Sequence, residues 1–153
     1  MNLILWRHAE AEIQREGQDD LDRELTSKGR RQARRMAEWL EAHLPATTRV
    51  IVSPAARTQQ TVASLERRFT TVEALAPERS VDDLLLAAGW PDGRDTVLVV
   101  GHQPTLGMAA ARLLSGSDQA WSVKKGAVWW LERREREGRV EVTLQAVQGP
   151  GKN

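Results

Sequence analysis

The sequence predicts one three-layer α/β/α domain with a largely parallel, mixed central sheet. Short, continuous apolar runs alternate with segments in which apolar residues recur every three or four positions. Buried strands and amphipathic helices alternate in this way in layered α/β domains. Polar motifs follow directly after three of the apolar runs, at the sheet edge where open parallel sheets bind their ligands.

The strands follow from the apolar runs. The runs at residues 3–6, 50–52 and 97–100 are continuous rather than alternating, which is typical of strands covered on both faces. Near the C-terminus, the polar stretch at residues 135–138 predicts a hairpin turn between two further strands. Strands are expected at residues 3–6, 50–52, about 72–75, 97–100, 128–131 and 140–147.

The helices follow from the apolar spacing and its boundaries. Thr26 can cap a helix that Pro45 ends, and Pro54 and Pro104 are favourable first-turn residues of two more. A further segment at residues 82–88 precedes the third apolar run. Helices are expected at residues 26–44, 54 to about 69, and 104 to about 116.

Length and composition restrict the class of protein. The 153 residues suffice for one domain, which we place at residues 1–147, with residues 148–153 as a frayed tail. A net charge of +1 gives no overall attraction to nucleic acid or membrane, and the absence of cysteine excludes disulfides and thiolate chemistry. No apolar run approaches the ~20 residues of a membrane span. We expect a cytoplasmic monomer that needs no cofactor or metal.

Four residues are predicted to share one edge of the sheet. Arg7 and His8 follow the first strand, Arg57 begins the helix after the second, and His102 follows a later strand. Since the carboxyl ends of parallel strands lie at one edge, these side chains should converge there. Ser53, at the end of the second strand, is expected beside them as a substrate-binding residue.

This set of residues is suited to phosphoryl transfer. Two guanidinium groups can bind a tetrahedral oxyanion in bidentate fashion. Their positive charge disfavours protonation of His8, and a neutral imidazole can attack phosphorus and form a phosphohistidine. Arg7, Arg57 and His102 would hold the oxygens of the transferring group, so no metal is required.

Four motifs resemble those of the histidine phosphatase superfamily, which includes phosphoglycerate mutases and acid phosphatases. They occur in the family's order within residues 1–115, and the chain length is similar to that of its short SixA-like phosphohistidine phosphatases. One departure is Ala9, where the family usually has glycine. The motifs are LWRHAE (5–10), LTSKGRRQA (25–33), SPAARTQQT (53–61) and VVGH (99–102).

The resemblance implies a phosphatase that hydrolyses phosphohistidine on a protein through a covalent intermediate on His8. A phosphatase for small phosphate monoesters is the alternative within this mechanism. A phosphate-binding or nucleic-acid-binding module without catalysis is a less favoured alternative. The arginines at 30, 31, 34 and 35 do not favour nucleic acid, because they lie off the apolar stripe of their helix.

The proton donor is less well defined by the sequence. Glu78 resembles the acidic position of the short branch, and Glu10 and Glu12 are rivals. A phosphohistidine phosphatase can also act without an acid, because imidazole, with a pKa near ~6.5, is a good leaving group. The aspartates at residues 19–22 are expected to form an ordinary loop near the site entrance, and Lys124 and Lys125 a solvated loop.

Overall fold

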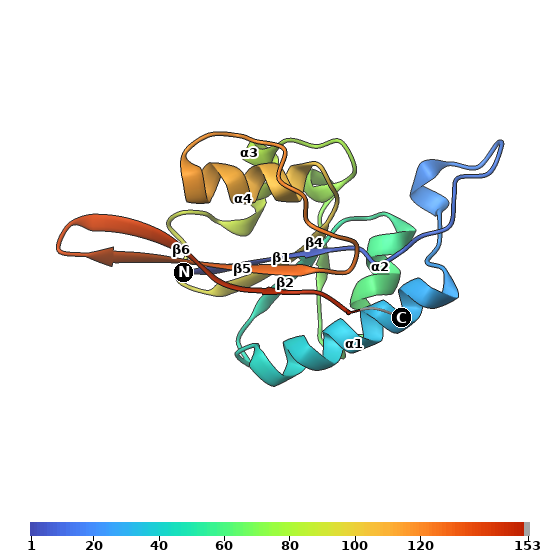
Figure 1. Ribbon diagram of the computed structural model, residues 1–153, viewed down its shortest axis with the longest axis horizontal. Helices are drawn as coiled ribbons and strands as arrows, with labels where there is room; N and C mark the ends of the chain where they lie inside the picture. The colour runs from blue at the N-terminus through green and yellow to red at the C-terminus, as the bar shows by residue number, and fades with distance from the viewer. Residues whose placement is uncertain (152–153) are drawn as a thin grey trace.

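Residues 1–151, which the computed structural model describes, form one six-stranded sheet with helices on both faces (Figure 1). The strands are β1 (Asn2–Arg7), β2 (Arg49–Val52), β3 (Thr70–Thr71), β4 (Thr96–Gly101), β5 (Val128–Arg136) and β6 (Arg139–Gln148). The α-helices are α1 (Ser27–His43), α2 (Ala56–Val62), α3 (Val81–Ala88) and α4 (Thr105–Ser115), and the 3-10 helices are η1 (Asp20–Asp22) and η2 (Glu73–Leu75).

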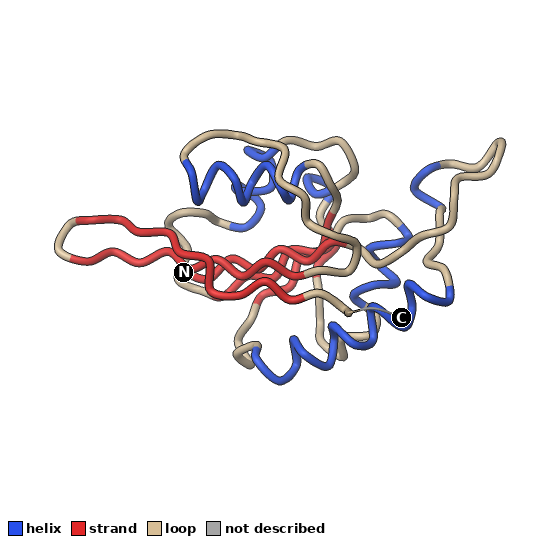
Figure 2. The backbone as a smooth tube through the Cα atoms, in the orientation of Figure 1, coloured by secondary structure: helices blue, strands red, loops and turns tan. Residues whose placement is uncertain are grey.

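The sheet is mixed, with the order β3-β2-β4-β1-β5-β6. Figure 2 shows its strands between helices on either side. β1 and β2 both pair with β4 in parallel, and β3 adds to β2 in parallel. β5 runs antiparallel to β1, and β6 antiparallel to β5. This confirms the predicted fold class, and it brings the carboxyl ends of β1, β2 and β4 to one edge.

Alternate residues of β1 enter two apolar cores, one on each face of the sheet. Leu3 and Leu5 pack with α3 and α4, whereas Ile4 and Trp6 pack with α1 and α2. In Figure 1, α3 and α4 cover one face of the sheet, and α1 and α2 cover the other. Burial on both faces is the reason that these strands are continuously apolar in sequence.

Two elements differ from the prediction. The helix expected from Pro54 to about Phe69 is α2, which ends at Val62. Arg67 instead turns back and donates hydrogen bonds to Glu41 and to the Pro45 carbonyl oxygen, an arrangement that a continuing helix would not allow. The strand expected at 72–75 lies earlier in the chain, as β3. Residues 73–75 instead form the 3-10 helix η2, which buries Leu75 in the core beside α3.

β5 and β6 form a long hairpin that projects beyond the helices (Figure 1). β6 extends to Gln148, and Nη1 of Arg35 donates to the Pro150 carbonyl oxygen at 3.1 Å, so part of the predicted tail contacts α1. Lys152 and Asn153 lie outside the described residues.

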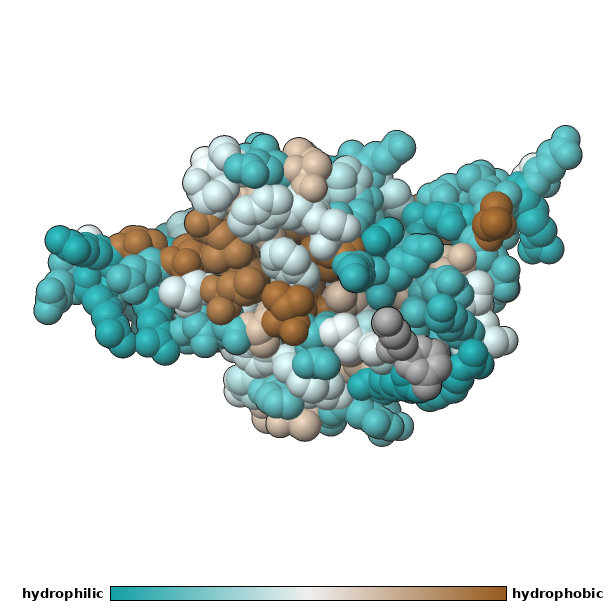
Figure 3. Space-filling model, in the orientation of Figure 1, coloured by the Kyte–Doolittle hydropathy of each residue, from teal (hydrophilic) through white to brown (hydrophobic). Residues whose placement is uncertain are grey.

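Figure 3 shows apolar side chains along the β6 edge, where Val140, Leu144 and Val147 are exposed. No helix within residues 1–151 has both the length and the apolar character needed to cross a membrane.

Candidate active site

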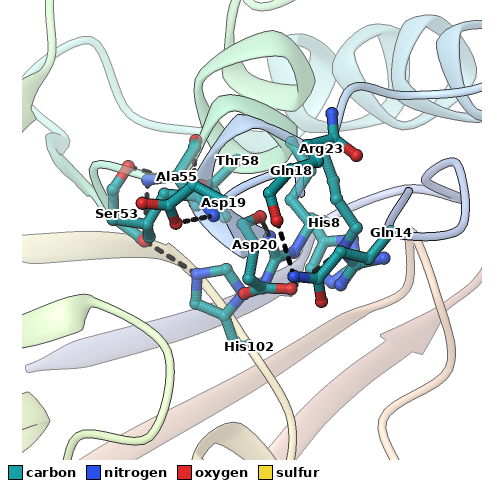
Figure 4. A network of polar contacts seen from close by, with 12 residues as sticks. His8, Gln14, Gln18, Asp19, Asp20, Arg23, Ser53, Ala55, Thr58 and His102 are labelled. Atoms are coloured by element: carbon teal, nitrogen blue, oxygen red, sulfur yellow. Dashed lines mark hydrogen bonds and ion pairs between the residues drawn. The ribbon is translucent and has the colours of Figure 1, made fainter. Parts of the chain in front are cut away.

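Backbone hydrogen bonds between neighbouring strand ends fix the three segments of the site. The His8 amide donates to the Gly101 carbonyl oxygen, and the Ser53 amide donates to the Val100 carbonyl oxygen, both at 3.1 Å. The ring centroids of His8 and His102 are consequently 5.4 Å apart (Figure 4). The structure therefore brings His8, Ser53 and His102 together at the predicted edge of the sheet.

The His8 ring is held so that one of its nitrogens is available for reaction. Nδ1 lies 2.7 Å from the Ala9 carbonyl oxygen, and a carbonyl can only accept, so Nδ1 carries the proton. Neutral His8 then has an unprotonated Nε2. Burial lowers the pKa of His8 to about 4 and is the largest cause; the hydrogen bond to Ala9 opposes it, and the charges of Arg57 and Arg7 lower it further. The charges of the arginines, from which the sequence predicts a neutral His8, are thus smaller causes than burial.

The second histidine is bound to Ser53. Nε2 of His102 lies 2.7 Å from Ser53 Oγ, and that oxygen accepts a hydrogen bond from the Ala55 amide at 3.3 Å. Nδ1 of His102 is buried and has no hydrogen-bond partner within residues 1–151. Burial, followed by the charge of Arg57, lowers the pKa of His102 to about 3, so this ring is also neutral near pH 7.

Both predicted arginines have hydrogen-bonding capacity that the described residues leave unused. Nη1 of Arg7 donates to the Val123 carbonyl oxygen at 3.0 Å, and Arg57 is only 4% exposed. The Nε atoms of Arg7 and Arg57 are buried without a partner among residues 1–151. Together with Nδ1 of His102, they form a set of nitrogens suited to the oxygens of a phosphoryl group.

A carboxylate that the sequence analysis assigned to an ordinary loop belongs to this site. Arg57 donates from Nη2 to Asp20 Oδ2 at 3.0 Å and from Nη1 to the Asp20 carbonyl oxygen at 2.8 Å. Arg23 donates from Nε to Asp20 Oδ1 at 2.9 Å, and Figure 4 shows Asp20 and Arg23 near the histidines. The one available signal was the Asp20–Arg23 spacing of three residues just before the LTSKGRRQA motif.

Asp20 is ionised at neutral pH. Burial by itself would raise the pKa of Asp20, but hydrogen bonds from Arg23 and Arg57 outweigh burial and lower it. Asp20 is therefore a charged partner of Arg57 and is poorly suited to donate a proton.

None of the three predicted acids is hydrogen-bonded to the side chains of this cluster within residues 1–151. Glu78 is exposed, in a left-handed backbone conformation with φ of 69°, and lines a surface pocket with Pro104 and Thr105. Glu10 accepts a hydrogen bond from Thr26 Oγ1 at 2.8 Å, and Glu12 is exposed. Within residues 1–151, Asp20 alone among the carboxylates is hydrogen-bonded to the side chains of the site.

Comparison with known proteins agrees with this geometry. The family model of the histidine phosphatase superfamily (branch 1) matches residues 3–79. The phosphohistidine phosphatase SixA homolog of Haemophilus influenzae is 33% identical over 129 residues, which are 74% of this chain and 77% of that protein. The SixA of Escherichia coli K12 is 29% identical over 124 residues, 76% of each chain.

A solved structure resembles the whole fold. The protein histidine phosphatase SixA complexed with tungstate superposes with a TM-score of 0.79 at 26% sequence identity, covering 98% of this chain and 97% of that one. The fold, the order of the motifs and a relative above 30% identity thus all indicate the same family. The chain is a phosphatase that belongs to the histidine phosphatase superfamily, in its SixA-like branch.

Proposed function

We propose that the protein hydrolyses phosphohistidine on a protein substrate through a covalent phosphohistidine on His8. The observation that supports this most directly is the state of His8: burial keeps the ring neutral, and its Nδ1–H bond to Ala9 leaves Nε2 free to attack. Arg7 and Arg57 lie close enough to lower the pKa of His8 by their charge, and they and His102 have unpartnered nitrogens that can donate to phosphoryl oxygens.

In the first step, Nε2 of His8 forms a bond to phosphorus while the bond from phosphorus to the substrate's imidazole nitrogen breaks. The electron pair of that bond stays with the departing imidazole, which leaves as a neutral ring when it takes up one proton. Arg7 and Arg57 stabilise the charge on the three transferring oxygens.

His102 has a specific part in this step. The Ser53 hydroxyl accepts from the Ala55 amide and can donate its own hydrogen to Nε2 of His102. Neutral His102 then carries its proton on Nδ1, the unpartnered nitrogen, which can donate to a phosphoryl oxygen. Ser53 is thus a residue that orients His102 rather than a direct ligand of phosphate.

In the second step, water attacks phosphorus and the bond from phosphorus to Nε2 of His8 breaks. Inorganic phosphate is released, one water proton leaves with the products, and His8 returns to its neutral form. Both steps proceed at one phosphate site, so no residue has to move from one position to another between them.

The placement of the candidate proton donors favours imidazole as the leaving group. An alkoxide needs a proton donor in the site, whereas imidazole has a pKa near ~6.5 and needs much less assistance. Glu78, our candidate for protonating alcohols, is exposed and makes no hydrogen bond to the histidines among the described residues. The site is therefore better equipped for phosphohistidine than for alkyl phosphates.

The short chain around the site favours a protein substrate. Residues 58–95, the 38 residues between Arg57 and Thr96, also build the rest of α2, β3, η2 and α3, which leaves little chain for a cover. A site without a cover surrounds a small ligand poorly but admits a side chain standing on a folded surface. The names of the relatives, phosphohistidine phosphatase and protein histidine phosphatase, support the same substrate class.

A substrate panel tests the proposal. We expect kcat/KM to be far higher for a histidine-phosphorylated protein than for sugar phosphates, nucleoside phosphates and phosphoserine, measured as phosphate release at one pH and ionic strength. A phosphorylated metabolite that matches or exceeds the protein would favour the small-monoester alternative. Phosphate binding without turnover of any substrate would favour the non-catalytic module.

A further inference from the structure

A groove of about 780 Å³ leads away from the phosphate site on the side of Arg7. We call it the basic groove; among its lining residues are Lys28, Lys124, Lys125, Trp129, Val147 and Pro150. Its lysines have no part in the proposed phosphoryl transfer. Because Arg7 belongs to both the groove and the phosphate site, the groove adjoins that site.

Positive charge is concentrated in this groove. Lys28, Lys124 and Lys125 are exposed, and none of them forms an ion pair within residues 1–151. Glu10 is the one acid on the lining, and its carboxylate already accepts a hydrogen bond from Thr26. The whole chain has a net charge of only +1, so this excess is local and selects for negative charge at one place.

The backbone next to Lys124 and Lys125 is fixed relative to the nucleophile. The Gly126 amide, directly after Lys125, donates to the His8 carbonyl oxygen at 3.0 Å. The indole nitrogen of buried Trp6 donates to the Gly126 carbonyl oxygen at 3.1 Å. The backbone that carries Lys124 and Lys125 therefore keeps a constant position relative to His8, which a group that selects substrates requires.

Apolar side chains also line the groove. Trp129 is half-buried, Val147 is 52% exposed, and Pro150 is held by its bond from Arg35. Val147 also continues the line of exposed apolar side chains along β6, with Leu144 and Val140 (Figure 3). Exposed apolar surface next to charge is typical of a protein interface and offers little to a sugar-phosphate backbone.

We propose that the basic groove binds an acidic segment of the protein substrate next to its phosphorylated histidine. This inference rests on the proposed function and adds the charge of the partner to it. The lysines recognise carboxylates that flank the histidine, and the apolar lining of Trp129, Val147 and Pro150 contacts apolar side chains of the same partner. An acidic protein surface thus uses both the lysines and the apolar lining, whereas a nucleic acid would use only the lysines.

Two pairs of peptides test this proposal. Each has one histidine flanked by four glutamates or by four glutamines, and is prepared with the histidine phosphorylated for kinetics or unphosphorylated and fluorescein-labelled for binding by anisotropy. The wild-type chain is compared with Lys124→Glu/Lys125→Glu. The matched control is Arg68→Glu/Arg136→Glu, which reverses two exposed charges outside the groove.

The expected result is an acidic-to-neutral kcat/KM ratio of about ten for the wild type and the control, falling below one in the lysine variant. The binding preference should change in the same way. A wild-type ratio near one, or a ratio that the lysine variant leaves unchanged, overturns the inference. So does tighter binding of a fluorescein-labelled single-stranded oligonucleotide than of the acidic peptide, if the lysine variant abolishes it.

The binding measurement separates the two proposals. If the wild type fails to hydrolyse either phosphorylated peptide but still binds the acidic peptide through the lysines, the proposed function is wrong and the acidic partner stands. If both phosphorylated peptides are hydrolysed at equal rates and bind equally, the function stands and the acidic partner is wrong.

Discussion

Arg57 and Asp20 form a two-point contact in the phosphate site, with Nη2 donating to Oδ2 at 3.0 Å and Nη1 to the backbone oxygen at 2.8 Å. The carboxylate of Asp20 thereby occupies Nη2, one of the donors that Arg57 could otherwise offer to a phosphoryl group. The two also differ in exposure, since the Arg57 side chain is 4% exposed and that of Asp20 is 41% exposed. An arriving phosphate can therefore displace the carboxylate into solvent while the arginine stays in place.

This contact predicts that Asp20→Asn strengthens binding of tetrahedral oxyanions. The amide keeps the size of the side chain but removes the charge that competes for Arg57, so inhibition by inorganic phosphate should improve by about threefold to tenfold. The measurement is the inhibition constant of phosphate at fixed ionic strength. Asp22→Asn, in the same turn and without a side-chain hydrogen bond among the described contacts, is the control. Weaker phosphate binding by Asp20→Asn would show instead that Asp20 holds Arg57 in its binding position.

The role of His8 predicts the loss of turnover on substitution. His8→Ala should lower kcat by about a thousandfold or more, because none of the surrounding described groups can accept the phosphoryl group in its place. Rapid quench of the wild type should trap an acid-labile, base-stable phosphoenzyme that is absent from the variant. His43→Ala is the control, since His43 stacks on Trp39 at the exposed end of α1, with ring centroids 4.3 Å apart. Substantial residual turnover in His8→Ala would contradict the covalent mechanism.

The burial of both site histidines predicts that neither ring titrates near the ordinary pKa of histidine. Since burial lowers the pKa of His8 to about 4 and that of His102 to about 3, both rings should be neutral from pH 5 upwards in the free protein. The chain has three histidines, so His8→Ala and His102→Ala assign the ring resonances in a heteronuclear NMR titration. Resonances of either ring that shift with a midpoint near ~6.5, the ordinary value, would contradict a buried, neutral nucleophile.

The same pKa values predict in which direction the free energy of unfolding changes with pH. The unfolded chain binds protons on these histidines below about pH 6.5, whereas the folded chain does so only near pH 4 and below. The free energy of unfolding should therefore lose a stabilising contribution as the pH falls below ~6.5. His8→Ala should reduce that dependence when urea denaturation is followed from pH 7 to pH 5.

We predict that activity does not depend on a metal. Arg7 and Arg57 carry the positive charge that a divalent cation would otherwise supply to the transferring phosphoryl group. Prolonged incubation with EDTA, followed by gel filtration, should leave kcat unchanged, and added magnesium should have little effect. Loss of activity that one specific cation restores would direct attention to the aspartates of residues 19–22.

The sequence was most informative where strand order alone determines position. Arg7 is the last residue of β1, and Ser53 and His102 each follow a strand of the parallel set, so their meeting required no knowledge of loops. Asp20 was missed because the path of residues 9–25 depends on contacts that leave no periodic pattern, such as the hydrogen bond from the Glu12 amide to the Glu24 carbonyl oxygen. The end of α2 was missed for a similar reason, since it depends on the contact between Arg67 and α1.

One motif residue was identified from resemblance but is explained only by the structure. Gly29, in LTSKGRRQA, lies in the first turn of α1 beside the backbone of Glu10. A Cβ at this position would lie 2.0 Å from the Glu10 carbonyl oxygen and 2.9 Å from its carbonyl carbon. That carbonyl also accepts a hydrogen bond from the Thr26 amide at 3.0 Å, so the backbone has little freedom to retreat. Glycine therefore permits α1 to approach the segment that follows His8.

This close approach predicts that Gly29→Ala destabilises the fold and impairs the site. Alanine favours a helix by ~1 kcal/mol over glycine, so a helix in open space would gain stability from the change. Here the clash should dominate and lower the free energy of unfolding by about 1–3 kcal/mol, as overpacking typically does. Because Glu10 lies two residues after His8, we also expect a lower kcat in the folded variant. The control is Gly149→Ala, where a Cβ would meet no atom within 4 Å. Urea denaturation of the three proteins measures the effect, and a Gly29→Ala protein as stable and active as the wild type would show that α1 can shift without disturbing His8.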